Sequence, residues 1–412
     1  MKLVVMKFGG SSVANAQKIK HVAGRVIAQQ AAGFRVVVVV SAPGDMTDDL
    51  IAMAEGVTDN PAPREMDVLL ATGEQASIAL LCMALHARGK DAISLTGRQA
   101  GIFADLEHTR ARITDIQPKK IHFELAKGRI VVVAGFQGIN ANDDITTLGR
   151  GGSDLTAMAL AAALKADLCE IYTDVEGVYT TDPRVVPDAR KLAEISYDEM
   201  LELAGSGAQV MQGRSVEVAK KFKVVFEVRS TFSEASGTRV HEEVSRMEDV
   251  VVSGIAFDRK QAKISIVDLP DRPGVAAEIF SALGKAGVNV DMIIQSEARQ
   301  GKNDISFTVS EGDLKKSIAA LEPVKQSLRA RELTSDTEVA KVAVVGVGMR
   351  SHPGVASKVF QVLAAHKINI QMISTSEIKI SCVIARAQVE EAVKLLHKAF
   401  ELEKEKSTVK AK

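Results

Sequence analysis

An internal repeat in the C-terminal part of the chain restricts the possible folds more than any other feature. The segment PGVAAEIFSALGKAGVNVDMIIQSE begins at Pro273, and PGVASKVFQVLAAHKINIQMISTSE begins 80 residues later, at Pro353. Each copy predicts a strand, a turn at Pro-Gly, an amphipathic helix and a second strand. Further strand patterns follow at Ile305–Val309 and Ile380–Ala385, each with a helix after it. We therefore expect two α+β modules of βαββαβ type.

The N-terminal part instead alternates short apolar runs with helical patterns. Val36–Val40 is a run of five valines, too short for a helix and typical of a strand buried on both faces. Other expected strands are Leu3–Met6, Ile130–Ala134, Leu168–Tyr172 and Val224–Arg229. The expected helices are Ala16–Gln30, a segment around Met66–Arg88, and Asp154–Leu164. This alternation predicts an α/β domain with a mostly parallel sheet between helices, in three layers.

A polar stretch at His241–Asp249 marks the expected boundary between these parts. We expect the N-terminal domain at residues 1–245, the first module at 263–337 and the second at 338–405. Residues 250–262 are candidates for completing the second module.

Charge and cysteine usage exclude several protein classes. The 412 residues include 52 Lys+Arg and 52 Asp+Glu, without a basic stripe, which argues against nucleic-acid or anionic-membrane binding. Cys82, Cys169 and Cys382 form no CxxC pair, so we expect reduced, mostly buried thiols. No run approaches the roughly 18 uninterrupted apolar residues of a membrane helix, and the apolar run of MKLVVMKFGG is too short for a signal peptide. The expected location is the cytoplasm.

The first segment that suggests chemistry is KFGGSS, Lys7–Ser12, between a strand and a helix. Gly9 and Gly10 let the backbone turn sharply and direct N–H groups at phosphate oxygens. The ammonium of Lys7 would neutralise charge on a transferring phosphoryl group. The alternative is a plain strand–helix turn with a solvated lysine, and the glycine pair alone favours that alternative. The GxxxxGK[ST] loop occurs nowhere in the chain.

The second segment is GRGGSD, Gly149–Asp154, which also precedes a predicted helix. Its glycines offer another anion-accepting backbone, and Arg150 presents a forked donor suited to a carboxylate. Ser153 or Asp154 could cap the helix. Alternatively, a buried Asp154 holds the phosphate-binding lysine in place, and the sequence leaves these two roles evenly balanced.

A third segment, YTDVEGVYTTDPR, follows the Leu168–Tyr172 strand. It is either a surface loop with an Asp-Pro turn or a nucleotide-handling loop. In the second interpretation Thr173, Asp174 and Asp182 form hydrogen bonds and Arg184 meets phosphate. Ser41, Thr47 and Glu74 are smaller signals, each more often an ordinary cap or turn residue. The eight histidines form no HExxH motif, and hydrolase chemistry has no support.

Taken together, these stretches resemble the aspartate kinases, within the amino-acid kinase superfamily. The matching segments, in the family's order and spacing, are KFGGSS, VVVVVSAPGDMTDDL, ATGE, GFQGIN, GRGGSD and YTDVEGVYTTDPR. The tandem repeat is similar to the family's paired ACT modules, which are ferredoxin-like. The resemblance spans nearly the whole chain. Glutamate 5-kinase and acetylglutamate kinase, from the same superfamily, generally lack this combination.

The resemblance implies transfer of phosphate from ATP, with Mg²⁺, to the side-chain carboxylate of L-aspartate. The product would be 4-phospho-L-aspartate, in the first step of the lysine, threonine and methionine branch. The implied nucleotide-binding residues are Lys7, Phe8, Gly9, Gly10, Ser41, Thr173, Asp174, Tyr179, Asp182 and Arg184. The implied aspartate-binding residues are Thr47, Glu74, Arg150 and Ser153.

Within these sets the resemblance also implies individual roles. Arg150 would pair with a substrate carboxylate, Glu74 would lie on the ammonium side, and Asp154 would organise the catalytic Lys7. An ionised carboxylate is already a nucleophile at neutral pH, so catalysis needs mainly alignment and charge neutralisation. One departure is Gln209, where the family often has a lysine. Lys220 and Arg214 are candidates to replace that charge.

The ACT-like pair resembles modules that bind amino acids between two copies. The implied effector site for lysine and/or threonine comprises Asp271, Gly274, Ala276, Gln295, Asn369 and Ile370. The alternative is that the repeats only pack and dimerise. Either interpretation favours a homo-oligomer, and Met247 is a possible start of a separate regulatory chain. Two other functions stay open: a kinase for another carboxylate such as glutamate, and a catalytically silent amino-acid sensor.

Overall fold

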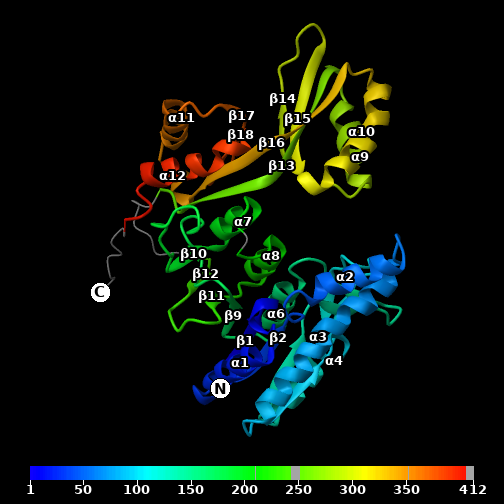
Figure 1. The fold of residues 1–412 in the computed structure, drawn as a ribbon, viewed down its shortest axis with the longest axis vertical. Helices are drawn as coiled ribbons and strands as arrows, with labels where there is room; N and C mark the ends of the chain where they lie inside the picture. Colours follow the sequence, from blue (N-terminus) through cyan, green and yellow to red (C-terminus); the bar gives the residue numbers. More distant parts are fainter. Residues whose placement is uncertain (209, 243–250, 351, 405–412) are drawn as a thin grey trace. The chain divides into compact units, whose positions relative to one another are not determined.

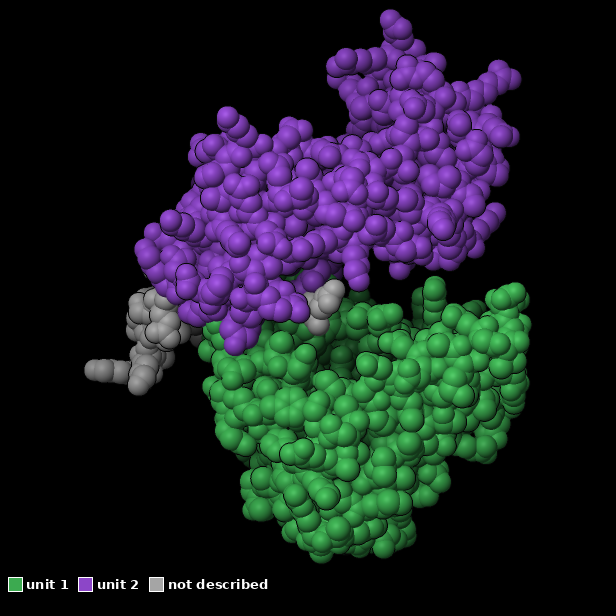
Figure 2. Space-filling view, in the orientation of Figure 1, with its two compact units in different colours: residues 1–178, 191–204, 209–245 green, residues 179–190, 205–208, 246–412 purple. Residues whose placement is uncertain are grey.

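The computed structural model of the protein divides into two compact units, which Figures 1 and 2 show. The N-terminal unit comprises residues 1–178, 191–204 and 209–245, and the C-terminal unit comprises 179–190, 205–208 and 246–412. The structure describes residues 1–208, 210–242, 251–350 and 352–404. Gln209, Met247 and most of the expected boundary His241–Asp249 lie outside the described residues.

An eight-stranded sheet forms the centre of the N-terminal unit, in the order β10-β12-β11-β9-β1-β2-β6-β3. Its pairings are parallel except for that between β11 and β12. The strands are β1 (Leu3–Phe8), β2 (Arg35–Val40), β3 (Ala92–Leu95), β6 (Ile130–Ala134), β9 (Leu168–Thr173), β10 (Glu194–Ser196), β11 (Phe226–Ser230) and β12 (Thr238–His241). The predicted parallel α/β fold is confirmed.

Helices cover both faces of this sheet. Val4, Met6 and Phe8 of β1 pack in one core cluster with α1 (Ala16–Ala31) and α3 (Pro63–His86). The helix α6 (Gly152–Ala163) contacts β1, β2 and β9 and contributes nothing to that cluster, which places it on the opposite face. The remaining helices of the unit are α2 (Met46–Val57), α4 (Gly97–Ala100), α5 (Lys119–Ala126), α7 (Tyr197–Gly205, whose last residue belongs to the other unit) and α8 (Gly213–Phe222).

The length and composition of α3 would by themselves allow it to cross a bilayer. Half of its apolar window is buried inside the structure, where α3 packs on α1, β3 and β6. Its apolar residues therefore form part of the core of the N-terminal unit.

The N-terminal unit also contains a four-stranded sheet, which was not predicted from the sequence. Its order is β5-β4-β7-β8, with β4 (Ile102–Ala104), β5 (Ile113–Ile116), β7 (Gln137–Ile139) and β8 (Ile145–Thr147). Strands of three or four residues are too short for a periodic pattern to identify them. This sheet matters for the site because β8 leads directly into GRGGSD and packs against α3.

The C-terminal unit contains a six-stranded antiparallel sheet in the order β14-β15-β13-β16-β18-β17. Its strands are β13 (Gly254–Pro270), β14 (Val290–Gln295), β15 (Lys302–Ser310), β16 (Glu332–Val345), β17 (Ile370–Thr375) and β18 (Lys379–Ala385). Its helices are α9 (Val275–Lys285), α10 (Leu314–Leu328), α11 (Val355–Ala365) and α12 (Val389–Ala399).

The two repeats share the long strands β13 and β16. Ile255 of β13 belongs to the core of the second repeat, with α11 and α12, whereas Ile264 belongs to the core of the first, with α9 and α10. The second repeat is thus completed by residues that precede the first. Gly274 and Gly354 occupy equivalent positions before α9 and α11, with φ of 99° and 97°. Such values favour glycine, which explains why the Pro-Gly turn recurs.

Candidate active site

The centre of the candidate site is an ion pair between β1 and α6. The Nζ of Lys7 lies 2.7 Å from Oδ1 of Asp154, and both residues are more than 90% buried. The N-cap of α6 is Gly151, with φ of 74°, and no side chain caps the helix. The interpretation of Ser153 or Asp154 as a cap is therefore wrong, and the structure pairs Asp154 with the lysine.

Two glycine turns meet beside this pair, one after β1 and one after β2. Gly44 N–H donates to the Gly10 carbonyl at 3.0 Å. A Cβ on Gly10 would lie 2.8 Å from the Ala42 oxygen and 3.0 Å from the Gly44 oxygen. A Cβ on Gly9 would lie 3.4 Å from Lys7 Nζ. Gly10 therefore has no room for a side chain, and the turn that contains it lies at the carboxyl ends of parallel strands, where α/β sheets bind ligands.

The variant Gly10→Ala tests this close approach. We expect kcat/KM for ATP to fall about tenfold or more, because the added methyl group forces the two turns apart. The control is Gly56→Ala in α2, where a Cβ meets nothing within 4 Å. Steady-state kinetics with ATP varied compares the two variants, and equal kinetics would show that the turns tolerate separation.

Glu74 of α3 contacts the same turn from the other side. It is 2% exposed, and its Oε1 accepts a hydrogen bond of 3.0 Å from Ala42 N–H. Its Oε2 is buried and has no hydrogen-bond partner among the described residues. Burial raises the pKa of the Glu74 carboxyl to about 7. A buried carboxylate oxygen without a partner is costly, so a ligand donor at this oxygen would be stabilising.

The segment after β6 joins the site through Gly135, where an added Cβ would lie 2.7 Å from Ser153 Oγ. Ser153 is buried at the start of α6, whereas Arg150 is exposed and has no ion pair within the described part of the chain. Gly135 is the first residue of GFQGIN, and no role was predicted for it from the sequence. Its signal was a glycine directly after a buried strand.

The structure places the other predicted nucleotide residues in different environments. Phe8 is fully buried and stacks on Tyr172 with ring centroids 4.6 Å apart, so only its backbone is available to a ligand. Ser41 follows β2, and its carbonyl accepts from Ser77 Oγ. Thr47 lies in the first turn of α2. Thr173, the last residue of β9, donates from Oγ1 to Asp174 Oδ1 at 3.0 Å.

Tyr179, Asp182 and Arg184 belong to the C-terminal unit. Asp182 and Arg184 form an ion pair of 2.7 Å, and the hydrogen bond from Arg184 lowers the pKa of the Asp182 carboxyl. The two candidates to replace the missing lysine are already engaged. Lys220 pairs with Asp198 at 2.6 Å, and Arg214 donates to the carbonyls of Leu148 and Ala111.

The predicted effector residues lie at three places: near the start of α9, at the end of β14 and near the start of β17. Asp271 accepts a hydrogen bond of 3.1 Å from Asn303, Gly274 is the N-cap of α9, and Ala276 lies in its first turn. Gln295 ends β14, Asn369 directly precedes β17, and Ile370 is the first residue of β17. Met292 of β14 and Met372 of β17 share one buried cluster, so the two edge strands approach each other.

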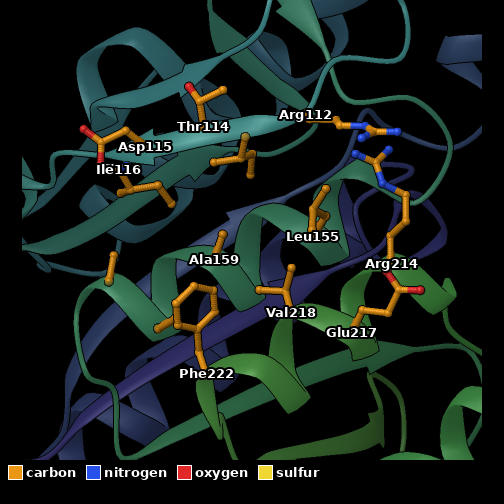
Figure 3. A pocket seen from close by; sticks show the side chains of 13 residues that line it. Arg112, Thr114, Asp115, Ile116, Leu155, Ala159, Arg214, Glu217, Val218 and Phe222 are labelled. Carbon is orange, nitrogen blue, oxygen red and sulfur yellow. Dashed lines mark hydrogen bonds between the residues drawn. The ribbon is translucent and has the colours of Figure 1, made fainter.

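A separate cavity of about 640 Å³ lies in the N-terminal unit between β5, α6 and α8 (Figure 3). Leu155 and Val218 contribute to its apolar wall, and the guanidinium groups of Arg112 and Arg214 point toward each other at one end (Figure 3). Arg214, a candidate to replace the missing lysine, lines this cavity, but none of the residues predicted to bind nucleotide, aspartate or effector does. The candidate active site is defined instead by the ends of β1, β2 and β6.

Comparisons with known proteins show which family the chain resembles over nearly its whole length. Residues 2–229 match the amino acid kinase family, and residues 264–323 and 342–400 match the ACT domain. The aspartate kinase of Pseudomonas putida is 52% identical over 98% of both chains. Two crystal structures of aspartokinase III from E. coli, each 28% identical, cover 97% of this chain and 99% of that one. The complex with aspartate and ADP has a TM-score of 0.82, and the complex with lysine and aspartate has one of 0.75.

The family match covers more than half of the chain, and the curated relative is similar over almost its entire length. These findings confirm the resemblance on which the sequence analysis relied, including the paired ACT modules. The chain belongs to the amino acid kinase family, among its aspartate kinases.

Proposed function

We propose that the enzyme transfers the γ-phosphoryl group of ATP to the side-chain carboxylate of L-aspartate, forming 4-phospho-L-aspartate and ADP. The observation that carries this proposal is the double contact of Ala42. Its carbonyl oxygen packs so close to Gly10, in the turn after Lys7, that a Cβ on Gly10 would lie 2.8 Å from it. Its N–H donates a hydrogen bond to Glu74 Oε1. A phosphate-binding turn and an ammonium-binding carboxylate are thereby joined through one residue, as an amino acid substrate of a kinase requires.

Four residues of the site have a proposed role in this reaction. Asp154 fixes the ammonium of Lys7, which neutralises charge developing on the transferred phosphoryl group. Oε2 of Glu74, which has no partner among the described residues, accepts a hydrogen bond from the ammonium group of the substrate aspartate. Arg150 pairs with the α-carboxylate of the substrate. The side-chain carboxylate, ionised at neutral pH, forms the new bond to phosphorus as the bond to ADP breaks. Mg²⁺ bound to ATP would neutralise charge on the phosphate oxygens.

The C-terminal unit is proposed to carry the regulation. We infer that lysine, threonine or both bind near Asp271, Gln295 and Asn369, and lower activity in the first step of lysine, threonine and methionine synthesis. The exposed Ile293 and Ile373 on β14 and β17 support pairing with a second copy, because large apolar side chains on edge strands favour association. The proposed location is the cytoplasm.

Trapping of the acyl phosphate with hydroxylamine tests the reaction. With ATP and Mg²⁺, we expect aspartyl hydroxamate from L-aspartate and no hydroxamate from L-glutamate. Glu74 and Arg150 fix the α-ammonium and α-carboxylate of the substrate, so the longer side chain of glutamate would place its carboxylate away from the γ-phosphoryl group. Added lysine plus threonine is expected to suppress the signal. Hydroxamate from glutamate alone would assign the enzyme to another carboxylate, and no signal with either substrate would favour a silent sensor.

The sensor alternative has little structural support. A protein that only bound effectors would gain nothing from the buried pair of Lys7 and Asp154, since burying two charges is costly. The pair is more easily explained by a requirement of catalysis.

A further inference from the structure

A second carboxylate of α3, that of Asp67, has no part in the mechanism above. Asp67 lies two turns before Glu74 on the same helix and is fully buried. A buried carboxylate requires several donors to offset its lost hydration. The identity of those donors indicates what Asp67 is for.

The donors come from two segments that are separate in the sequence. Oδ1 of Asp67 accepts from Thr147 Oγ1, at the end of β8, at 2.5 Å and from Thr109 N–H at 3.0 Å. Oδ2 lies 2.7 Å from Nδ1 of His108. One carboxylate therefore ties α3 both to β8 and to the loop between β4 and β5.

The bound loop has a strained backbone. Thr109 has φ of 64°, a value that β-branched residues rarely adopt. The loop also packs on β8, because Ala111 N–H donates to the Thr147 carbonyl at 2.9 Å. A Cβ on Gly149 would lie 3.3 Å from the Thr109 oxygen. Strain of this kind persists where the surrounding structure fixes it, and the carboxylate of Asp67 supplies that constraint.

We propose that Asp67 is a positioning residue for aspartate binding. Thr147 is three residues before Arg150, and Asp67 is seven residues before Glu74. The contact between Asp67 and Thr147 therefore sets the carboxylate-binding arginine at a fixed position relative to the ammonium-binding glutamate. This inference rests on the proposed function, which gives Arg150 and Glu74 those roles.

The test is the kinetics of Asp67→Asn. The amide keeps one acceptor oxygen but offers His108 an N–H in place of the second acceptor. We expect KM for aspartate to rise about tenfold, whereas KM for ATP stays within about twofold. Thr147→Val, which removes one donor without changing α3, is expected to shift the same constant in the same direction by a smaller factor.

The control is Glu124→Gln in α5, another buried carboxylate, which pairs with Arg129 at 2.9 Å. It is expected to lower the melting temperature without changing the ratio of the two KM values. If Asp67→Asn behaves like this control, or raises both KM values equally, the residue is only structural and the inference is wrong. A wild-type enzyme that forms no aspartyl hydroxamate would instead overturn the proposed function and, with it, this inference.

Discussion

Replacement of Lys7 by alanine is expected to lower kcat by about 10³-fold, the loss typical of removing one preorganised donor from a developing charge. The ammonium is buried and held at 2.7 Å by Asp154, so its position is fixed before substrate binds. Water that fills the vacated space supplies no positive charge. Asp154→Asn is expected to lower kcat by a smaller factor, because the lysine stays but loses its fixed orientation.

The measurement is ADP release at saturating ATP and aspartate. Lys20→Ala on α1 is the matched control, since Lys20 is exposed and the substitution removes the same charge. Binding of lysine or threonine to the C-terminal unit should be unchanged in Lys7→Ala, and an unchanged far-UV circular dichroism spectrum would show that the N-terminal unit is folded. Activity within tenfold of the wild type would exclude Lys7 from the role proposed for it.

Much of the fold could be predicted because its strands are buried on both faces. Val36–Val40 could be recognised as a strand without knowledge of its neighbours, because an unbroken run of valines is typical of a strand buried on both faces. The two C-terminal modules could be predicted for a different reason, because the same sequence pattern is present twice. By contrast, sharing of β13 between the repeats was left open, because Ile255 and Ile264 are both ordinary alternating residues of one strand.

The candidate site was only partly predictable, because its central contacts join distant segments. The residues alone left two roles open for Asp154, and the resemblance favoured a link to Lys7; the structure shows an ion pair between the two side chains. The two contacts of Ala42 could not be predicted from the sequence, because its backbone N–H and carbonyl groups make them and every residue except proline has both groups. Asp67 was missed because its donors, Thr109 and Thr147, are 42 and 80 residues away. Such constellations depend on tertiary approach rather than on local pattern.

Glu74 is expected to give the enzyme a pH dependence near neutrality. Its carboxyl has a pKa of about 7, raised by burial, and its ionised form is the one that binds an ammonium group. In the free enzyme, kcat/KM for aspartate should therefore rise as the pH increases through about 7. Glu74→Gln is expected to lower kcat/KM about hundredfold at pH 8, by leaving the substrate ammonium without its counter-charge, and to abolish this step.

The same group makes an opposite prediction for stability. A pKa raised from 4.5 to about 7 means that the folded protein holds this proton more tightly than the unfolded chain does. The resulting stabilisation is complete below about pH 4.5 and is lost as the pH rises through 7, a change of about 3 kcal/mol. Relative to the wild type, Glu74→Gln should thus be more stable at pH 8 than it is at pH 5.

Thermal unfolding at pH 5 and pH 8, with and without L-aspartate, measures this effect. Aspartate should stabilise the wild type more at pH 8 than at pH 5, because its ammonium offsets the cost of the buried charge. In Glu74→Gln that difference should disappear. A wild type stabilised equally by aspartate at both pH values would mean that Glu74 does not contact the ammonium, and the orientation of aspartate in the site would then have to be reversed.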